Sequence, residues 1–597
     1  MKITSMNFNP RTRKLFALPR LLKRSFPAAV ALVSLTLAVV SAHSQFVLTP
    51  VSDLPGVVAG SVAWGDYDND GHLDFLLSGS LEIALWRNTG SGFNNVTASV
   101  APGLPGLYDS SVAWGDFDND GRLDLLITGL TNFSGGAVTQ VWRNTGGVFT
   151  NFPVAGLAGI AESSAAWRDY DGDGRLDFLI TGATNGASTG TISQLWRNTG
   201  NGFTNVPIPG LPGVFVGSMA WGDFDNDGRP DFLITGITNG PSGGAASQLW
   251  RNTGNGFTNV QIPGLRGVFA SSVAWGDYDN DGLLDFLLEG LAGNTFVSEL
   301  WRNTGNGFTN VPLPGLPAFA DGSLAWGDYD NDGRLDFLIT GLTNGVTEIS
   351  QIWRNTGGGF TNVVIPELPG NFDNSLAWAD YDNDGRLDFL IAGTISGGIV
   401  SQLWRNTGLE SNSAPPAPFG LSSTVSGDTV RLNWNPLADD HTPAAGLTYD
   451  VRIGATPGGV DILSPEADPT TGWRRVATLG NLGENLSTTF HLSPGNYYWS
   501  VQVVDTSFAG SAFAAEQQFS IGLQLTNSFR HANGDFEFGF TGTRGASFTA
   551  VATPNISLPL SNWTVLGGVT EISPGQFKFL DPQAANNPQR FYRVRSP

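Results

Sequence analysis

The chain has 597 residues, more than a single hydrophobic core supports, so several domains are expected. Its 53 acidic and 31 basic residues give a formal charge of −22, which argues against nucleic acid or an anionic membrane as a partner. It has no cysteine, which excludes disulfides and cysteine zinc sites, and its 78 glycines and 34 prolines indicate an all-β protein rich in turns.

Residues 1–42 have the layout of a Sec-type signal peptide. Seven basic residues precede the apolar stretch FPAAVALVSLTLAVVSA, and cleavage is expected near Ala42 or Ser44. The alternative is a membrane anchor, but about 16 apolar residues fall short of the ~20 that span a bilayer. We therefore predict a protein that is secreted or associated with the cell surface, without a lipobox, without a later transmembrane segment and with a mature charge near −29.

Seven copies of one unit follow. A tryptophan in an AW-x-D segment recurs every 50 to 54 residues from Trp64 to Trp378, and a second, in WRNTG, recurs from Trp86 to Trp404. The step from the WRNTG tryptophan to the next phenylalanine is seven residues in the first six units, whereas the two tryptophans of a unit are 22 to 29 residues apart. The connection between those tryptophans is therefore a variable surface loop, a common place for binding.

Each unit is predicted to form four short strands. SVAWGD alternates in polarity, DFLLSG is continuously apolar as in a strand covered on both faces, and SQLWRN and GFTNV flank a Gly/Asn hairpin turn. Radial stacking of four-stranded units gives a propeller blade. After Trp404 the expected phenylalanine is missing, because Ser411 takes its place, whereas Phe46 lies 18 residues before Trp64, the spacing found inside the array. The amino-terminal strand is thus predicted to complete the last blade and close the ring.

The pattern D-x-D-x-D-G-x-x-D recurs in all seven units and holds 28 of the 53 acidic residues. Like charges this close repel, by roughly 3 kcal/mol at about 5 Å and an effective dielectric of ~20, so a bound cation is expected. Oxygens at positions 1, 3, 5 and 9 and the backbone carbonyl at position 7 suit Ca²⁺, whereas Mg²⁺ is less suited and a metal-free acidic turn is the remaining alternative. The predicted ligands, with position 7 contributing only its carbonyl, are Asp66, Asp68, Asp70, His72 and Asp74; Asp116, Asp118, Asp120, Arg122 and Asp124; Asp169, Asp171, Asp173, Arg175 and Asp177; Asp223, Asp225, Asp227, Arg229 and Asp231; Asp277, Asp279, Asp281, Leu283 and Asp285; Asp328, Asp330, Asp332, Arg334 and Asp336; and Asp380, Asp382, Asp384, Arg386 and Asp388.

Units such as VAWGDYDNDGRLDFLITG…SQLWRNTGNGFTNV resemble VCBS/FG-GAP repeats, which are related to the integrin α propeller. The resemblance covers residues 46–408 and implies a seven-bladed β-propeller with about seven structural calcium ions, in a class of repeat often found in secreted or surface proteins. The sequence departs from the pattern at Arg168, in place of Gly, Gly172, in place of Asn, and Pro230, in place of Leu. Pro230 is expected to disturb its unit most, because it lacks a backbone N–H.

Residues 409–420 are a Pro/Ser-rich linker. Residues 421–521 resemble a fibronectin type III-like sandwich through Trp434, Tyr449 and the Tyr497–Trp499 cluster. Residues 522–597 resemble a small β module found at the carboxyl end of secreted bacterial proteins.

No catalytic residues are predicted. G-x-S-x-G occurs at residues 186–190 and 240–244, but in variable loops without a strand-to-helix elbow, and the five histidines are scattered. The repeated tryptophans are interpreted as packing between blades rather than as sugar-stacking platforms. The sequence favours a monomeric, secreted binding or adhesion scaffold that presents variable loops to an extracellular glycan or protein; the alternative is a carbohydrate-active enzyme or lectin that uses the central face.

Overall fold

A computed structural model describes residues 45–595, apart from residues 134, 185–189, 239–243, 438, 440, 524, 543–546, 574–575 and 588. The predicted signal peptide, residues 1–42, lies outside the described residues, as does most of each G-x-S-x-G match. The described chain is all-β, with one four-residue α-helix, α1 (Thr97–Val100), and two 3-10 turns, η1 (Leu560–Asn562) and η2 (Ala584–Asn586).

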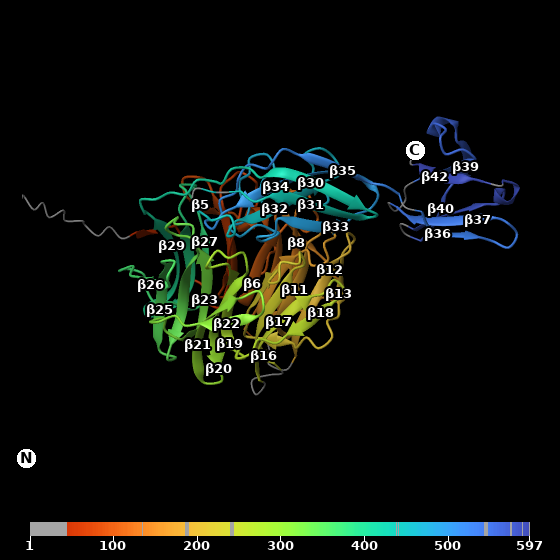
Figure 1. Ribbon diagram of the computed structural model, residues 1–597. Coiled ribbons are helices and arrows are strands. Elements are labelled where there is room, and N and C mark those ends of the chain that lie inside the picture. The colour runs from red at the N-terminus through yellow and green to blue at the C-terminus, as the bar shows by residue number, and fades with distance from the viewer. Residues whose placement is uncertain are drawn as a thin grey trace, which may run out of the picture. The chain divides into compact units, whose positions relative to one another are not determined.

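Each repeat forms an antiparallel sheet of four strands, as predicted, except that the first strand of the fourth repeat is divided in two (Figure 1). The first strands are β2 (Val62–Gly65), β6 (Tyr108–Gly115), β10 (Ile160–Arg168), β14 (Val214–Phe215) with β15 (Met219–Gly222), β19 (Phe269–Gly276), β23 (Phe319–Gly327) and β27 (Phe372–Ala379). The second strands are β3 (Asp74–Gly79), β7 (Asp124–Leu130), β11 (Asp177–Thr184), β16 (Asp231–Thr238), β20 (Asp285–Ala292), β24 (Asp336–Thr343) and β28 (Asp388–Ile395). The third strands are β4 (Glu82–Asn88), β8 (Ala137–Asn144), β12 (Thr191–Asn198), β17 (Ala245–Asn252), β21 (Thr295–Asn303), β25 (Thr347–Asn355) and β29 (Gly398–Asn406). The fourth strands are β5 (Phe93–Asn95), β9 (Phe149–Phe152), β13 (Phe203–Val206), β18 (Phe257–Val260), β22 (Phe308–Val311), β26 (Phe360–Val363) and, for the last repeat, β1 (Phe46–Thr49).

The last repeat borrows its fourth strand from the start of the chain, which confirms the prediction made from Phe46. Strand β1 pairs antiparallel with β29, and Phe46 lies opposite Asn406. The Phe46 ring is buried against Tyr329, Trp378 and Phe389. The first and last repeats are therefore joined by hydrogen bonds and core packing, and the repeats close into a β-propeller.

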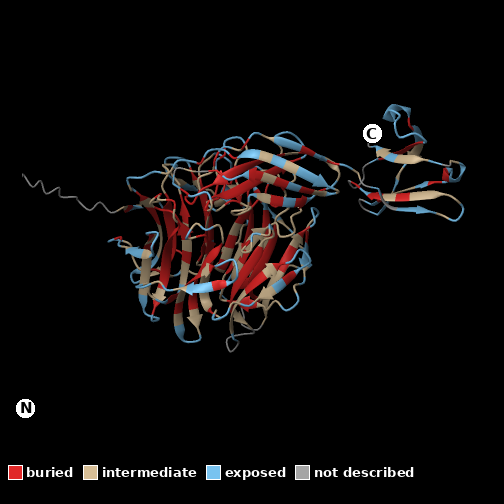
Figure 2. Ribbon diagram, viewed as in Figure 1, coloured by how far each residue is buried: buried red, intermediate tan, exposed pale blue. Residues whose placement is uncertain are grey.

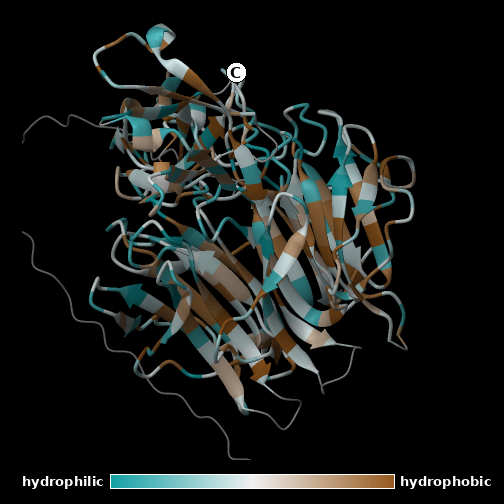
Figure 3. Cartoon of the chain, turned by 90° about the vertical axis from the view of Figure 1, so that its right-hand side faces the viewer, coloured by the Kyte–Doolittle hydropathy of each residue, from teal (hydrophilic) through white to brown (hydrophobic). Residues whose placement is uncertain are grey.

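The predicted difference in burial between strands is confirmed. Every residue of β3 and β7 is buried, whereas β6 alternates, and Figure 2 shows red, buried residues along the strands of the ring. Hydrophobic residues run along the same strands in Figure 3. The first and third strands flank this apolar strand at its edges within its own sheet. Neighbouring repeats cover its two faces, so side chains on both faces are buried.

The repeated tryptophans pack between repeats, as predicted. Trp64 lies opposite Phe75, which lies opposite Trp86, so three rings meet across this sheet, as they do in every other repeat except the second, where Leu125 replaces the phenylalanine. The indole Nε1 of the first-strand tryptophan also donates a hydrogen bond to an alanine carbonyl of the preceding repeat, as Trp114 does to Ala63 at 3.1 Å. The same bond joins Trp64, Trp167, Trp275, Trp326 and Trp378 to Ala377, Ala113, Ala220, Ala274 and Ala325.

Trp221 is the exception, and Arg168 supplies the reason. In most repeats the residue after the AW tryptophan is glycine, and a Cβ on Gly115 would come within 2.7 Å of the Trp167 ring of the next repeat. Ala379 holds this position in the seventh repeat, and Trp64 still bonds to Ala377, so a Cβ alone is tolerated. The longer side chain of Arg168 holds it in the third repeat, and there the buried Nε1 of Trp221 has no hydrogen-bond partner.

Pro230 leaves the ladder of its second strand intact, although the fourth repeat is the one in which the first strand is divided, into β14 and β15. Strand β16 begins at Asp231, with Gly222 paired to Asp231, which is the register of Gly65 and Asp74 in the first repeat. Pro230 precedes the first residue of the ladder, so its missing N–H costs no bond between strands.

Two three-stranded sheets follow the propeller and enclose one core around Trp434, Tyr449 and Trp499. One is ordered β30 (Phe419–Ser426), β31 (Thr429–Asn435), β33 (Ser487–His491), and the other β32 (Thr448–Gly454), β34 (Gly495–Val504), β35 (Gln517–Ile521). The remaining strands form a sheet of β36 (Leu525–Arg530), β37 (Phe536–Thr541), β41 (Gln576–Asp581) and β40 (Thr570–Ser573), and a sheet of β39 (Thr564–Gly568), β38 (Thr549–Thr553) and β42 (Phe591–Arg595).

Candidate functional site

The aspartate loops connect the first strand of each repeat to the second. In the first loop both carboxylate oxygens of Asp66 accept backbone hydrogen bonds, Oδ1 from the Asp70 N–H at 3.0 Å and Oδ2 from the Gly71 N–H at 2.9 Å. The same pair of bonds recurs in all seven loops, for example from Asp120 and Gly121 to Asp116. The first aspartate therefore shapes the turn as well as contributing charge.

The ninth-position aspartate ties the loop to the rest of its repeat. Asp74 is fully buried and accepts hydrogen bonds from the backbone N–H groups of Tyr67 and Asn88, at 3.1 and 2.7 Å. The Asn88 side chain donates to the Leu73 carbonyl and to the Tyr381 carbonyl of the last repeat. Sequence reasoning missed this asparagine, although WRNTG recurs in every unit, because a repeated asparagine beside a turn was taken only as a hairpin signal.

The aspartates at positions 3 and 5 of the motif share an arginine, which sequence reasoning also missed. Arg87, from WRNTG, places Nε 2.6 Å from Asp68 Oδ2 and Nη2 3.0 Å from Asp70 Oδ2. The equivalent arginine of each other repeat pairs with the aspartates at positions 3 and 5 of its own loop. These arginines are Arg143, Arg197, Arg251, Arg302, Arg354 and Arg405. The argument that these carboxylates repel one another unopposed was therefore incomplete.

Position 7 also does more than the sequence predicted. Where position 7 is an arginine, its side chain pairs with the aspartate at position 5, as Arg122 does with Asp120. Its Nε donates to the carbonyl of the third-strand asparagine, at 3.1 Å from Asn144. The same side-chain pairing is made by Arg175, Arg229, Arg334 and Arg386.

Carboxylate oxygens are nonetheless left facing a shared centre. In each of the first five loops three aspartates offer oxygens within 4.8 Å of one another, as Asp116, Asp118 and Asp124 do. One oxygen of Asp118 faces Arg143, and the other, Oδ1, is buried without a hydrogen-bond partner. The Oδ1 atoms of Asp171, Asp225, Asp330 and Asp382 are in the same state. A donor set of oxygens alone fits a hard cation such as Ca²⁺ better than a soft one.

Burial sets the ionisation of these carboxyls. It raises the pKa of Asp66 to about 6 and that of Asp74 to about 9, although backbone N–H groups favour the charged forms. The same cause raises the pKa of Asp124 and Asp388 to about 9. At neutral pH a cation in the loop would therefore displace protons as well as compensate charge.

Residues 421–521 contact the loops directly. The Thr506 hydroxyl donates to Asp328 Oδ2 at 2.9 Å, and Asn485 Nδ2 donates to Asp223 Oδ2 at 2.9 Å. The Asp66 N–H donates to the Arg475 carbonyl at 2.8 Å. The loop ends of the first, fourth and sixth repeats are thus in contact with this segment rather than free.

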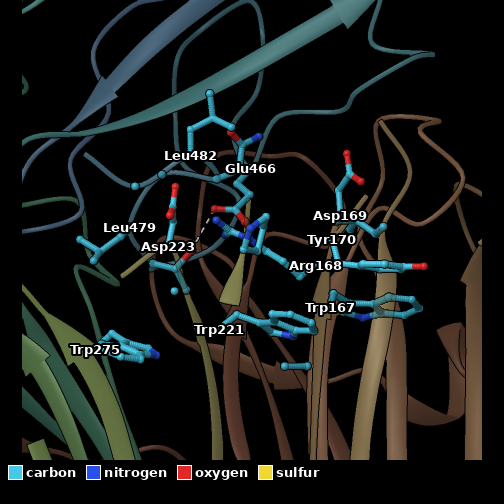
Figure 4. Close-up of a pocket in the computed structure, with 18 of the residues that line it drawn as sticks. Trp167, Arg168, Asp169, Tyr170, Trp221, Asp223, Trp275, Glu466, Leu479 and Leu482 are labelled. Carbon is cyan, nitrogen blue, oxygen red and sulfur yellow. Dashed lines mark hydrogen bonds between the residues drawn. The ribbon is translucent and has the colours of Figure 1, made fainter. Parts of the chain in front are cut away.

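A cavity of about 1040 Å³ lies where residues 421–521 meet the third and fourth repeats, and it continues along the inner strands. Figure 4 shows Trp167, Arg168, Tyr170 and Trp221 on one side of it and Glu466, Leu479 and Leu482 on the other. Trp167 and Trp221 are half-buried, whereas the other five first-strand tryptophans are at most 9 % exposed. The opening therefore coincides with Arg168, where glycine is replaced.

The described histidines do not form a cluster with one another. His531 pairs with Glu537 at 3.1 Å, and His72, at position 7 of the first aspartate loop, lies 3.4 Å from the Asn383 amide of the last loop. No helix in the described part of the chain is both long enough and apolar enough to cross a bilayer.

Comparison with known proteins identifies the repeats. Residues 66–127, 169–234 and 237–288 match the FG-GAP-like repeat family. The T-cell immunomodulatory protein of Rattus norvegicus is 28 % identical over 227 residues, which is 35 % of this chain and 34 % of that protein. The Homo sapiens protein of the same name is 26 % identical over 254 residues, 37 % of this chain and 40 % of that protein. The match thus spans well under half the length of these relatives.

Two lectins are among the solved structures with a similar chain path. A lectin of Agrocybe aegerita that recognises non-reducing terminal N-acetylglucosamine has 17 % identity and a TM-score of 0.36, over 57 % of this chain and 86 % of the lectin. A variant of the Aleuria aurantia lectin in complex with α-methyl-L-fucoside has 9 % identity and a TM-score of 0.31, over 52 % of this chain and 97 % of the lectin.

Proposed function

We propose, from the premise that this chain is an FG-GAP-like repeat protein, that it is an exported, calcium-stabilised binding module built on a seven-bladed propeller. The proposed ligand is an extracellular glycan, bound in the cavity at Arg168. Seven repeated sheets, the last completed by β1, support the proposed blade number. Export is proposed from residues 1–42, which have the features of a signal peptide.

Calcium is proposed as a structural ion in each aspartate loop. The support is the convergence of carboxylate oxygens in the loops, together with the buried, unpartnered Oδ1 atoms at the third position, for example in Asp118 and Asp330. The aspartates at positions 1, 3, 5 and 9 would hold the ion, with the backbone carbonyl at position 7 as a further ligand. The arginines of WRNTG would limit the repulsion that remains when the ion is absent.

Residues 421–521 are proposed to be a fibronectin type III-like domain. Counted along this segment, the first, second and fourth strands form one sheet and the third, fifth and sixth form the other, as in a sandwich of two three-stranded sheets. The Tyr497 hydroxyl, near the start of β34, donates to the Ser493 carbonyl at 2.6 Å, which matches the tyrosine corner of immunoglobulin-like sandwiches.

The observation that carries the ligand assignment is the set of half-buried aromatic rings around Arg168. Trp167, Tyr170 and Trp221 offer flat apolar faces of the kind that stack on sugar rings. Arg168 and the nearby Glu466 and Asn485 supply donors and acceptors for hydroxyl groups. The proposed site thus lies at the aspartate-loop end, whereas the variable loops lie at the other end, and two of these fall largely at residues 185–189 and 239–243, outside the described residues.

The test is a glycan array probed with residues 45–597, alongside turnover assays on the glycans that bind. Binding is expected without cleavage, and Arg168→Gly, which restores the residue found in most other repeats, is expected to weaken it at least about tenfold. Arg530→Gly, an exposed arginine outside the cavity, is the matched control. Binding unchanged in Arg168→Gly would reject the site, no glycan binding would favour a protein ligand, and depolymerisation would favour a carbohydrate-active enzyme.

A further inference from the structure

The propeller has a second acidic feature, at the end opposite the aspartate loops. Each first strand begins there with a bulge residue in the left-handed region, with φ between 46° and 55°. These residues are Ala59, Asp109, Glu162, Val216, Ala270, Asp321 and Asp373. Backbone bonds between repeats join several of them, since the Val216 N–H donates to the Glu162 carbonyl, the Ala270 N–H to Val216 and the Ala59 N–H to Asp373. Four of the seven positions are acidic, although non-glycine residues pay a conformational cost in this region.

These four acidic side chains lack the compensation found in the loops. The described residues provide no hydrogen bond or ion pair to the carboxylates of Asp109, Glu162, Asp321 or Asp373, whereas every aspartate loop pairs with the WRNTG arginine of its own third strand. Burial, followed by repulsion from Glu162 and Asp373, raises the pKa of Asp109 to about 7. Burial and then Asp321 raise the pKa of Asp373. The mouth of the propeller thus concentrates negative charge from four repeats.

Glu289 adds an independent observation. Its side chain is fully buried, and neither carboxylate oxygen has a hydrogen-bond partner. Burial, followed by repulsion from Asp321, raises the pKa of Glu289 well above its usual range. The nearby Ser272 N–H opposes this shift but is not placed to form a hydrogen bond with the carboxylate. A buried ionised carboxylate without a partner is strongly destabilising, so this position requires either a proton or a cation.

The register shows where Glu289 points. At the equivalent second-strand position other repeats have a hydroxyl that bonds to the residue after the bulge in the next repeat, as Thr235 does to Ser271 at 2.8 Å. The pairs Ser78–Ser110, Thr128–Ser163 and Thr340–Asn374 are made in the same way. In the sixth repeat that residue is Gly322, which has no side chain to bond, so Glu289 is left without a partner at this position and interacts electrostatically with Asp321 of the adjacent bulge.

We propose that Glu289 and Asp321 bind a hard divalent cation at this mouth, separate from the aspartate loops. Glu289 supplies a buried carboxylate and Asp321 an exposed one, so the ion is held at the junction of the fifth and sixth repeats and remains open to solvent on one side. Oxygen-only ligands with one open side suit Ca²⁺ or Mg²⁺ with bound waters. Asp373 and Asp109 lie further round the mouth and attract the cation without ligating it.

The experiment compares bound metal in the mature chain, residues 45–597, after EDTA treatment, saturation with Ca²⁺ and removal of free ion. Glu289→Gln keeps the shape and removes the charge, Glu289→Thr introduces the residue of four other repeats, and Asp321→Asn removes the second ligand. Each variant is expected to retain one ion fewer per chain than the unmodified protein, with Asp428→Asn, an exposed acidic residue elsewhere, as the matched control. A crystal soaked in Mn²⁺ is expected to show an anomalous peak beside Glu289.

Equal metal content in all three variants and the unmodified protein would overturn the proposal, because Glu289 would then simply carry a proton. Stabilisation by spermidine that depends on Glu289, without any loss of metal in the variants, would also overturn it and identify the occupant as an organic ammonium ion. Loss of one ion in Glu289→Thr with an unchanged circular dichroism spectrum would support it even if Glu289→Gln folded poorly.

Discussion

The indole Nε1 of Trp64, in the first repeat, donates a hydrogen bond of 3.3 Å to the carbonyl of Ala377, in the last. The same contact joins other neighbouring repeats, so the two ends of the array meet through an interface like those inside it. Closure therefore depends on the same packing that holds one repeat to the next, together with the added strand β1.

Phe46→Ala is expected to destabilise the protein by about 3–5 kcal/mol, because it removes a ring that is 1 % exposed at the closing contact. Urea unfolding followed by tryptophan fluorescence measures the change. Val47→Ala, at a neighbouring side chain that is 49 % exposed, is the control and is expected to change stability little. Equal stability of both variants would show that β1 does not hold the ring closed.

Removing calcium is expected to lower the melting temperature by more than ~10 °C, since each site at 100 times its Kd adds about 2.7 kcal/mol to the folded state. Differential scanning calorimetry in Ca²⁺ and in EDTA gives the shift. Asp124→Asn is expected to reduce the calcium-dependent part, because Asp124 belongs to a converging carboxylate set. A melting temperature that is the same in Ca²⁺ and EDTA would leave the arginine pairs as the only compensation for the loop charges.

Gly115→Ala is expected to cost about 1–3 kcal/mol, because the added Cβ would lie 2.7 Å from the Trp167 ring and force it outward. Thermal unfolding monitored by near-ultraviolet circular dichroism reports both the stability and the tryptophan environment. Gly147→Ala, where an added Cβ meets nothing within 4 Å, is expected to be nearly neutral. If both substitutions were neutral, the close approach of glycine and tryptophan would not govern the spacing between repeats.

Asp505 is expected to make stability fall as the pH rises from about 4 to about 7. Burial raises its pKa from 3.8 to about 7 in the folded protein, so in this interval the folded state binds a proton that the unfolded state has lost. The contribution is greatest below pH 4 and is lost above pH 7. Asp505→Asn is expected to remove this part of the slope when unfolding is measured across the range in saturating Ca²⁺; an unchanged slope would assign the dependence to other carboxyls.

Repetition made the propeller predictable. Fixed spacing predicted the four strands, the hairpin between the third and fourth strands and the return of Phe46 to the last repeat, because each follows from a distance along the chain. The pairing of Arg87 with Asp68 and Asp70 was not predicted, because those residues meet only after the third strand folds beside the loop. A repeated arginine opposite a repeated aspartate was the available signal.

Contacts between distant segments lay beyond sequence reasoning. Thr506 and Asp328 are joined across 178 residues, and no repeat pattern links them. Arg168 was noted as a departure from the pattern, but its effect on the Trp221 indole could be derived only from the geometry of the neighbouring repeat. The proposed calcium and glycan sites rest on side-chain geometry as well as on sequence.

The pairing of β1 with β29 has a consequence for biogenesis. Strand β1 is synthesised before all seven repeats, yet Phe46 cannot meet Asn406 until the last repeat has been made. Contacts so remote along the chain form slowly, because a large loop must close first. A nascent chain therefore carries open sheet edges at both ends of the array, which puts it at risk of intermolecular pairing until its final repeat arrives.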